Sequence, residues 1–129
     1  VLFRSGILHS YKIELKSTKK ISRSDTNTQD EWTWIELHSV QQDDTGWLLN
    51  GKADLICFER DNCFEFYNRV DLIKRVNQLV DFNTFANSSS NARYILYSRP
   101  GRPDIITLIE FDKIKDLCIG RWHKRRNND

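Results

Sequence analysis

Strict alternation of apolar and polar side chains predicts a β-strand over residues 11–17. The apolar positions of this strand are Tyr11, Ile13 and Leu15. Because successive side chains of a strand point to opposite faces, Glu14 and Lys16 share the other face, about 7 Å apart for a rise of roughly 3.3 Å per residue. We expect the apolar face to enter a core and the charged face to present an acid and an amine away from it.

A second alternating pattern predicts a strand over residues 32–40. Its aliphatic positions, Ile35 and Leu37, alternate with polar or aromatic ones that include Glu36. We therefore expect Glu36 on the face opposite the aliphatic side chains. The residues between the two strands, 17–31, are almost all polar and predict a long loop or the tip of a hairpin.

The rest of the chain predicts a hairpin, a helix, two further strands and a short final helix. The apolar run at residues 52–59 is typical of a central strand covered on both faces. In order, the predicted elements are a strand at 52–59, its hairpin partner at 64–67, a helix carrying Leu72, Ile73, Val76, Leu79 and Val80 with Asn68 as its N-cap, a loop at 81–91, strands at 93–98 and 105–110, and a short helix capped by Asp112. This order predicts an α+β or α/β core with one mainly mixed or antiparallel β-sheet.

Length and composition indicate a single domain. With 129 residues, 39% of them hydrophobic, the chain predicts one domain over residues 6–120 and a basic C-terminal tail at 121–129. No apolar run approaches the roughly 18 residues of a membrane span, so we expect no membrane partner. The cysteines form no C-x-x-C pair and no zinc pattern with the three histidines, which favours packing roles and a cytoplasmic location. They are Cys57, Cys63 and Cys118.

Positive charge is modest in total but clustered along the chain. The net charge of +2 does not by itself indicate nucleic acid as a partner. The candidate phosphate-binding residues in loops and turns are Lys19, Lys20, Arg23, Arg99 and Arg102. The alternative is that these are ordinary solvated loop residues. Similarly, Trp32, Trp34 and Trp47 either stack on unpaired bases or close the core and cover a sheet edge.

The first five residues, VLFRS, differ in character from the rest of the chain. They resemble a translated sequencing adapter or, less well, a protease-cleavage scar. We therefore expect residues 1–5 to be non-native, and we expect sequence that preceded Gly6 to be missing, as in a metagenomic fragment. No acidic residue precedes Glu14 in the chain.

Four blocks of sequence, taken in order, resemble a known family. The blocks are YKIELKS, WTWIELHSV, DDTGWLLNGKADLICFE and FEFYNRVDLIKRV. Over residues 11–80 they are similar to small phage and mobile-element members of the PD-(D/E)xK nuclease superfamily. The resemblance implies an α/β restriction-endonuclease-like core, a central mixed β-sheet flanked by helices, that lacks its first helix and strand. It also implies hydrolysis of DNA phosphodiesters with Mg²⁺, for which Mn²⁺ is a substitute, in the cytoplasm of a bacterial or phage-infected host.

The same resemblance assigns roles to a few residues. Glu14 would be a metal ligand, Leu15 would give its backbone carbonyl to the same metal, and Lys16 would stabilise charge or position the attacking water, roles that suit a hard cation bound through oxygen. Glu36 would be a second metal ligand or a water positioner, or else a polar residue on a sheet face paired with Lys52. The superfamily places an Asp upstream of the E-x-K motif, and this chain has none.

Three functions remain open from the sequence. The first is a Mg²⁺-dependent DNA endonuclease, inactive as this fragment if the upstream Asp is required. The second is a non-catalytic nuclease-fold module that binds DNA or a protein. In the third, a structural accessory domain, the E-x-K pair is an ordinary ion pair on a solvated sheet face. A homodimer is compatible with each of them.

Overall fold

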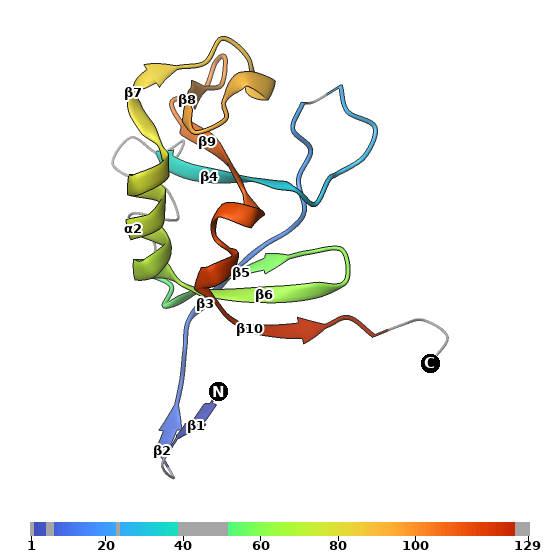
Figure 1. The fold of residues 1–129 in the computed structure, drawn as a ribbon, viewed down its shortest axis with the longest axis vertical. Helices are drawn as coiled ribbons and strands as arrows, with labels where there is room; N and C mark the ends of the chain where they lie inside the picture. Colours follow the sequence, from blue (N-terminus) through green and yellow to red (C-terminus); the bar gives the residue numbers. More distant parts are fainter. Residues whose placement is uncertain (1, 5–6, 23, 39–51, 126–129) are drawn as a thin grey trace.

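In the part of the chain that the structure describes, the strands divide between two four-stranded sheets and one small hairpin (Figure 1). The structure is a computed structural model and describes residues 2–4, 7–22, 24–38 and 52–125. The strands are β1 (Leu2–Arg4), β2 (Ile7–His9), β3 (Ile13–Lys16), β4 (Trp32–His38), β5 (Leu55–Glu59), β6 (Cys63–Asn68), β7 (Asp81–Phe85), β8 (Ile95–Ser98), β9 (Ile105–Glu110) and β10 (Cys118–His123). The helices are α2 (Arg69–Leu79) and short 3₁₀ turns at Ser89–Asn91, Phe111–Lys113 and Lys115–Leu117.

Both four-stranded sheets are mixed. The first sheet has the strand order β10-β6-β5-β3, with β3 parallel to β5 and the other neighbours antiparallel. The second has the order β4-β9-β8-β7, with only β7 and β8 parallel. The α+β class is as predicted, but the strands form two sheets where we expected one central sheet. The reason is that the chain leaves the first sheet after β3, contributes β4 to the second sheet and then returns to the first as β5.

Helix α2 begins where the sequence predicted it. The Oδ1 atom of Asn68 accepts hydrogen bonds from the backbone N–H groups of Val70 and Asp71, at 3.0 and 3.4 Å. Such a cap satisfies amide groups that have no partner inside the helix. Leu72 and Val76, which are buried, turn the apolar stripe of the helix toward the sheets. The predicted helix and its N-cap are therefore confirmed.

One hydrophobic core serves both sheets and the helix. The first sheet contributes Ile56, Phe58 and Tyr67, α2 contributes Leu72 and Val76, and the second sheet contributes Ile35, Leu37, Leu96 and Ile109. The ring of Phe58 packs edge-on against Tyr67 and Phe111, at centroid separations of 5.5 and 5.3 Å. Burial in this core raises the pKa of the Tyr67 hydroxyl. The shared core fixes the second sheet relative to the first.

Strand β3 presents its side chains in the opposite sense to our prediction. In the register with β5, Glu14 lies beside Ile56 and Lys16 beside Phe58. Ile56 and Phe58 are core residues, so the charged pair lies on the core-facing side of the sheet, at its edge. Ile13 and Leu15 lie on the outer face and are 47% and 60% exposed. The expectation that the apolar face enters the core is therefore wrong. A shift of one residue exchanges the two faces of a strand, and this register is set by the partner strand rather than by the local pattern.

The outer face of the first sheet remains apolar across its strands. Leu15, Cys57 and Phe66 are successive cross-strand neighbours, and Trp122 of β10 packs on Phe66 at a centroid separation of 5.1 Å while 69% exposed. Burial raises the pKa of the Cys57 thiol to about 11. This outer apolar face is thus partly open to solvent.

The remaining differences concern local elements. Residues 81–85, expected in a loop, form β7, whose first residue Asp81 accepts hydrogen bonds from the Asn83 amide and the Thr84 hydroxyl. Asp112 caps no helix, because the chain after β9 forms two 3₁₀ turns without a side-chain cap. Residues 121–123, expected in a C-terminal tail, belong to β10 and pair with β6.

Candidate functional site

A hollow of about 600 Å³ opens between the second sheet and the segment that joins β3 to β4. Five residues singled out from the sequence as catalytic or DNA-binding line it: Lys16, Lys19, Lys20, Glu36 and Arg99. Two aromatic side chains, Trp34 and Tyr97, line the same hollow. The structure therefore brings together side chains from β3, the following loop, β4, β8 and the turn after β8. We refer to this feature as the cationic hollow.

The floor of the cationic hollow is the outer face of the second sheet. Glu36 on β4, Ile106 on β9 and Tyr97 on β8 are cross-strand neighbours, and Trp34 lies two residues from Glu36 on the same face. The opposite face carries Ile35, which is fully buried in the core. The predicted alternation of β4, with Glu36 facing away from the aliphatic residues, is confirmed.

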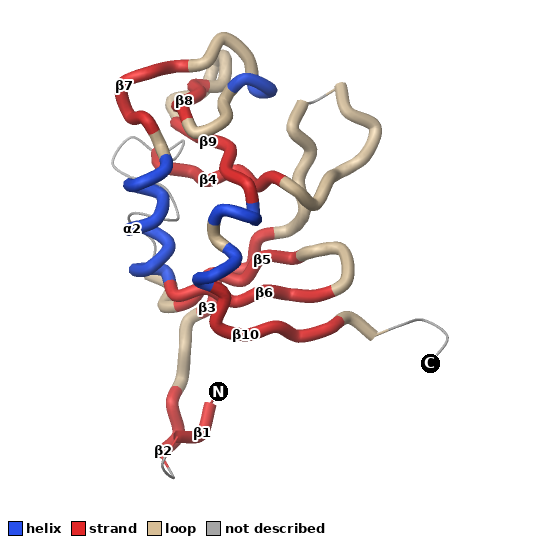
Figure 2. The backbone as a smooth tube through the Cα atoms, viewed as in Figure 1, coloured by secondary structure: helices blue, strands red, loops and turns tan. Residues whose placement is uncertain are grey.

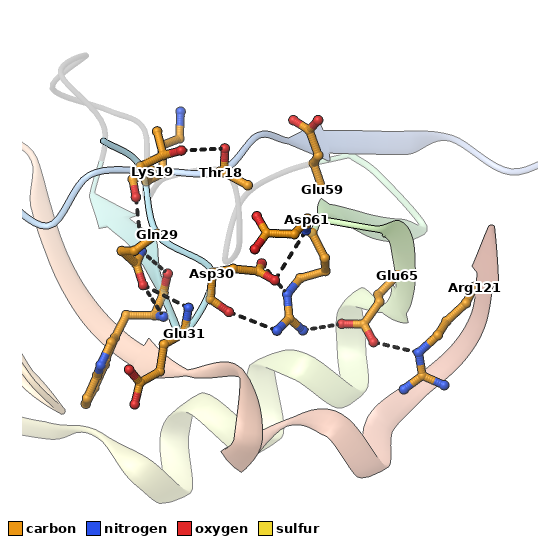
Figure 3. A network of polar contacts seen from close by, with 12 residues as sticks. Thr18, Lys19, Gln29, Asp30, Glu31, Glu59, Asp61, Glu65 and Arg121 are labelled. Carbon is orange, nitrogen blue, oxygen red and sulfur yellow. Dashed lines mark hydrogen bonds and ion pairs between the residues drawn. The ribbon is translucent and has the colours of Figure 1, made fainter. Parts of the chain in front are cut away.

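The first wall of the hollow is the loop between β3 and β4, the long excursion drawn in tan in Figure 2. An isolated antiparallel bridge joins Lys19 to Gln29. The Gln29 amide donates to the Lys19 carbonyl at 3.0 Å and to the Trp32 carbonyl at 2.6 Å, while its oxygen accepts from the Trp32 and Glu31 amides (Figure 3). One amide side chain thus closes the loop in place of a longer strand ladder.

The loop is also attached to the floor of the hollow. The indole Nε1 of Trp34 donates to the Lys20 carbonyl at 3.0 Å. This hydrogen bond fixes the plane of the Trp34 ring and holds the backbone of Lys20 beside β4. Lys19 and Lys20 are exposed and stand at the mouth of the hollow on a braced backbone.

A set of ion pairs anchors the far end of the loop to the first sheet. Asp30 accepts from the Arg60 Nε at 2.7 Å, Arg60 donates to Glu65 at 2.5 Å, and Glu65 accepts from Arg121 at 2.7 Å. Figure 3 shows Glu65 lying between the Arg60 contact and Arg121. The Arg60 guanidinium also stacks over the Phe111 ring, 3.8 Å from its centroid. We call these four charged residues the Arg60 network.

The electrostatics of the Arg60 network favour its charged state. Burial works to lower the pKa of Arg60, but the hydrogen bonds to Asp30 and Glu65 outweigh it and the pKa lies above its ordinary value. The hydrogen bond to Glu65 likewise raises the pKa of Arg121. Glu65 is only 5% exposed, and its two carboxylate oxygens accept from Arg60 and Arg121.

The second wall of the hollow is the turn that follows β8. The Arg102 amide donates to the Arg99 carbonyl at 3.1 Å, with Pro100 and Gly101 between them. Gly101 has a φ of 76°, the left-handed conformation that a type II turn requires at its third position. The turn brings Arg99 to the hollow, where its guanidinium pairs with Asp104, a fully buried carboxylate.

Charge within the cationic hollow is only partly balanced. The Lys16 ammonium lies 3.1 Å from a carboxylate oxygen of Glu14, and Arg99 pairs with Asp104. In the described residues, no carboxylate lies within ion-pair distance of Lys19 or Lys20, and no side chain engages the Glu36 carboxylate. The charges of Lys19 and Lys20 are therefore not balanced by ion pairs, and they give the hollow an excess of positive charge.

Several predicted site residues lie elsewhere. Glu14 and Leu15 do not line the hollow, and the Leu15 side chain faces the outer apolar face of the first sheet. Arg102 is exposed beyond the Pro-Gly turn and does not line it either. Arg23 lies outside the described residues, as do Trp47 and the rest of residues 43–51 in the block DDTGWLLNGKADLICFE. Trp32 packs against Tyr94 at 5.7 Å, so for this tryptophan the packing interpretation is confirmed.

The donor set does not fit a metal ion held by protein ligands alone. Among the described residues, no three side chains of His, Cys, Asp or Glu gather in a way that could hold a metal ion. The Glu14 carboxylate is already engaged by the Lys16 ammonium. Any Mg²⁺ here would take most of its ligands from water and phosphate, as this ion does beside one or two carboxylates.

Two contributors to the site were missed in the sequence. Tyr97 stands two residues before Arg99, and the alternation of β8 would have placed both on the same face. Gln29 had no such signal, because its role depends on the fold bringing Lys19 and Trp32 within reach of one amide.

Comparison with known proteins gives no family for the chain. No family model, curated protein or solved structure matches it. Within the described part of the chain, no helix is both long and apolar enough to cross a membrane.

Proposed function

We propose that the chain binds DNA through the cationic hollow. The observation that carries this proposal is the convergence of Lys16, Lys19, Lys20 and Arg99 on one hollow from separate parts of the sequence. Lysine and arginine side chains gathered on one face are the usual electrostatic footprint of a phosphate-binding surface. The net charge of the whole chain is only +2, so the attraction depends on this local excess.

The structure of the walls supports a binding role. Lys19 and Lys20 sit on a backbone held by Gln29 and by the Trp34 indole. A braced backbone reduces the conformational entropy that is lost when phosphates are bound. Because neither lysine is paired with a described carboxylate, each is available to displace a counterion from DNA.

The test is DNA binding measured by fluorescence anisotropy over a series of salt concentrations. The combined variant Lys19→Ala, Lys20→Ala should bind about tenfold more weakly at low salt, and its log–log salt slope should be shallower by about 0.9 for each duplex phosphate that the variant no longer neutralises. The matched control is Lys74→Ala, Lys113→Ala, which removes the same charge from exposed positions outside the hollow. Equal losses in both variants would show that binding is not localised at the hollow.

A second candidate function is Mg²⁺-dependent hydrolysis of DNA by a restriction-endonuclease-like core. It is favoured by one observation: Lys16 and Glu36 line the same hollow, and Glu14 lies next to Lys16. In this proposal the Lys16 ammonium stabilises charge on the phosphate, a role that requires it to leave Glu14.

Hydrolysis is tested by nicking of supercoiled plasmid with Mg²⁺ or Mn²⁺, on the chain and on a form extended by any native upstream sequence. Glu14→Gln, Lys16→Ala and Glu36→Gln should each abolish nicking, while Glu31→Gln, an exposed acid outside the hollow, should not. DNA binding without nicking in either form would leave the binding function and reject hydrolysis.

A further inference from the structure

The cationic hollow has an aromatic wall that phosphate binding alone does not use. Trp34 and Tyr97 both line it, with ring centroids 6.5 Å apart and ring planes inclined by 35°. Both side chains are half-buried, and Ile21 and Ile106 extend the apolar surface around them. The hollow therefore combines a cationic mouth with an aromatic interior whose floor also carries the Glu36 carboxylate.

The Trp34 ring is held in place. Its one polar atom, Nε1, already donates to the Lys20 carbonyl, so the part of the indole that faces the hollow is its apolar surface. A ring fixed in this way loses little conformational freedom when a flat ligand stacks on it. The same hydrogen bond fixes the position of the Trp34 ring relative to the loop that carries Lys19 and Lys20.

These two properties select between forms of DNA. A duplex offers phosphates and groove edges to a protein, but its base faces are stacked inside the helix. An unpaired nucleotide offers a base face and phosphates together, and aromatic platforms beside basic grooves are the usual means of binding single strands. The volume of about 600 Å³ lies within the range of small-molecule sites, which suits one nucleotide better than a segment of duplex.

We propose that the hollow takes an unpaired nucleotide of a DNA strand, with its base on Trp34 and Tyr97 and its flanking phosphates at Lys19 and Lys20. This inference rests on the proposed DNA binding and specifies the form of DNA bound. It assigns recognition to the aromatic wall and general affinity to the cationic mouth.

The experiment compares a labelled single strand with a duplex of the same length by anisotropy, for wild type, Trp34→Ala, Tyr97→Ala and Trp122→Ala. Wild type should bind the single strand at least tenfold more tightly than the duplex. Each of the two hollow variants should lose about 5- to 100-fold in single-strand affinity and little in duplex affinity. Trp122→Ala removes an exposed tryptophan from the other sheet and should leave both affinities unchanged.

Trp34→Ala also removes the hydrogen bond to the Lys20 carbonyl and could weaken binding by loosening the loop. Tyr97→Ala separates this effect from the loss of stacking, because among the described hydrogen bonds Tyr97 makes none to the Lys20 carbonyl. Equal affinity for both forms of DNA, with both aromatic variants neutral, would overturn this inference and leave phosphate binding by Lys19 and Lys20 intact. Insensitivity of all binding to the two lysines would instead reject the proposed function. An RNA strand of matched sequence serves as a further arm, and tighter binding of RNA would overturn the assignment to DNA.

Discussion

The Arg60 network and the cationic hollow arrange charge in opposite ways. In the network, each arginine meets a carboxylate at 2.5 to 2.7 Å, and the central carboxylate, Glu65, is nearly inaccessible to solvent. In the hollow, Lys19 and Lys20 are exposed and no described carboxylate pairs with them. The difference separates charge that is consumed in holding the fold together from charge that remains available to a ligand.

The two regions are physically connected. The loop between β3 and β4 carries Lys19 and Lys20 near its start and Asp30 near its end, and Gln29 joins the two parts. The Arg60 network, in which the charges are paired, therefore anchors the loop whose unpaired lysines line the cationic hollow. This relation is tested by variants of Arg60, which anchors the loop, and of Gln29, which connects its two parts.

Breaking the anchor should have the largest effect. Arg60→Ala leaves Asp30 and the buried Glu65 without their shared partner, and we expect the free energy of unfolding to fall by about 3 kcal/mol. The measurement is urea unfolding followed by circular dichroism. Arg102→Ala, which removes an exposed arginine, is the control and should change stability by no more than about 0.5 kcal/mol. Similar midpoints for the two variants would mean that the network contributes little.

Breaking the connection should have an intermediate effect on stability and a visible effect on binding. Gln29→Ala removes the amide that donates an exposed hydrogen bond to the Lys19 carbonyl and a part-buried one to the Trp32 carbonyl, and we expect a loss of about 2 kcal/mol. DNA affinity should fall as well, although Gln29 carries no charge, because the lysines lose their fixed position. Thr28→Ala, which removes one exposed hydroxyl contact from the same loop, is the matched control. If affinity is unchanged in Gln29→Ala, the loop does not need bracing to bind.

Cys57 is a buried titratable group whose pKa, unlike the pKa values of Arg60 and Arg121, is shifted by burial alone. Burial raises the pKa of this thiol to about 11, from an ordinary value of 9.0. Its contribution to stability is thus complete below the unfolded pKa and is lost as the pH rises toward 11, because the unfolded thiol ionises first. Between about pH 8 and about pH 10 the wild type should lose about 1 kcal/mol that Cys57→Ala does not lose.

The effect at Cys57 is checked by urea unfolding of both proteins at the two pH values, since the difference between them isolates the Cys57 thiol from other groups that titrate in alkali. Identical pH dependence would contradict the burial of this thiol in the folded state.

Local patterns predicted the elements whose structure depends on neighbours in sequence. Asn68 and the apolar spacing of Leu72 and Val76 were sufficient for α2, and alternation placed Glu36 correctly on β4. The face of β3 was not predictable in this way, because its register with β5 depends on a crossover through the second sheet. The division into two sheets has the same cause.

Several residues of the candidate site could be predicted from the sequence, but their position around one hollow could not. Lys16, Glu36 and Arg99 were each identified from the sequence, and only the fold shows that they line one hollow while Glu14 does not. The pairing of Arg60 with Asp30 and Glu65 likewise joins segments that no local pattern connects. Tertiary contacts decided which charged residues became structural and which remained exposed.

Exposed apolar side chains lie on both edge strands of the first sheet, Ile13 and Leu15 on β3 and Trp122 on β10, and they have a consequence for solution behaviour. Added salt of the strongly hydrated kind strengthens association between such surfaces, whereas it weakens contacts to phosphate. Light scattering that rises with ammonium sulfate would therefore report self-association through the first sheet. In the proposed function, anisotropy that falls over a potassium chloride series would report release of DNA from the cationic hollow, so the two surfaces can be followed separately in one protein sample.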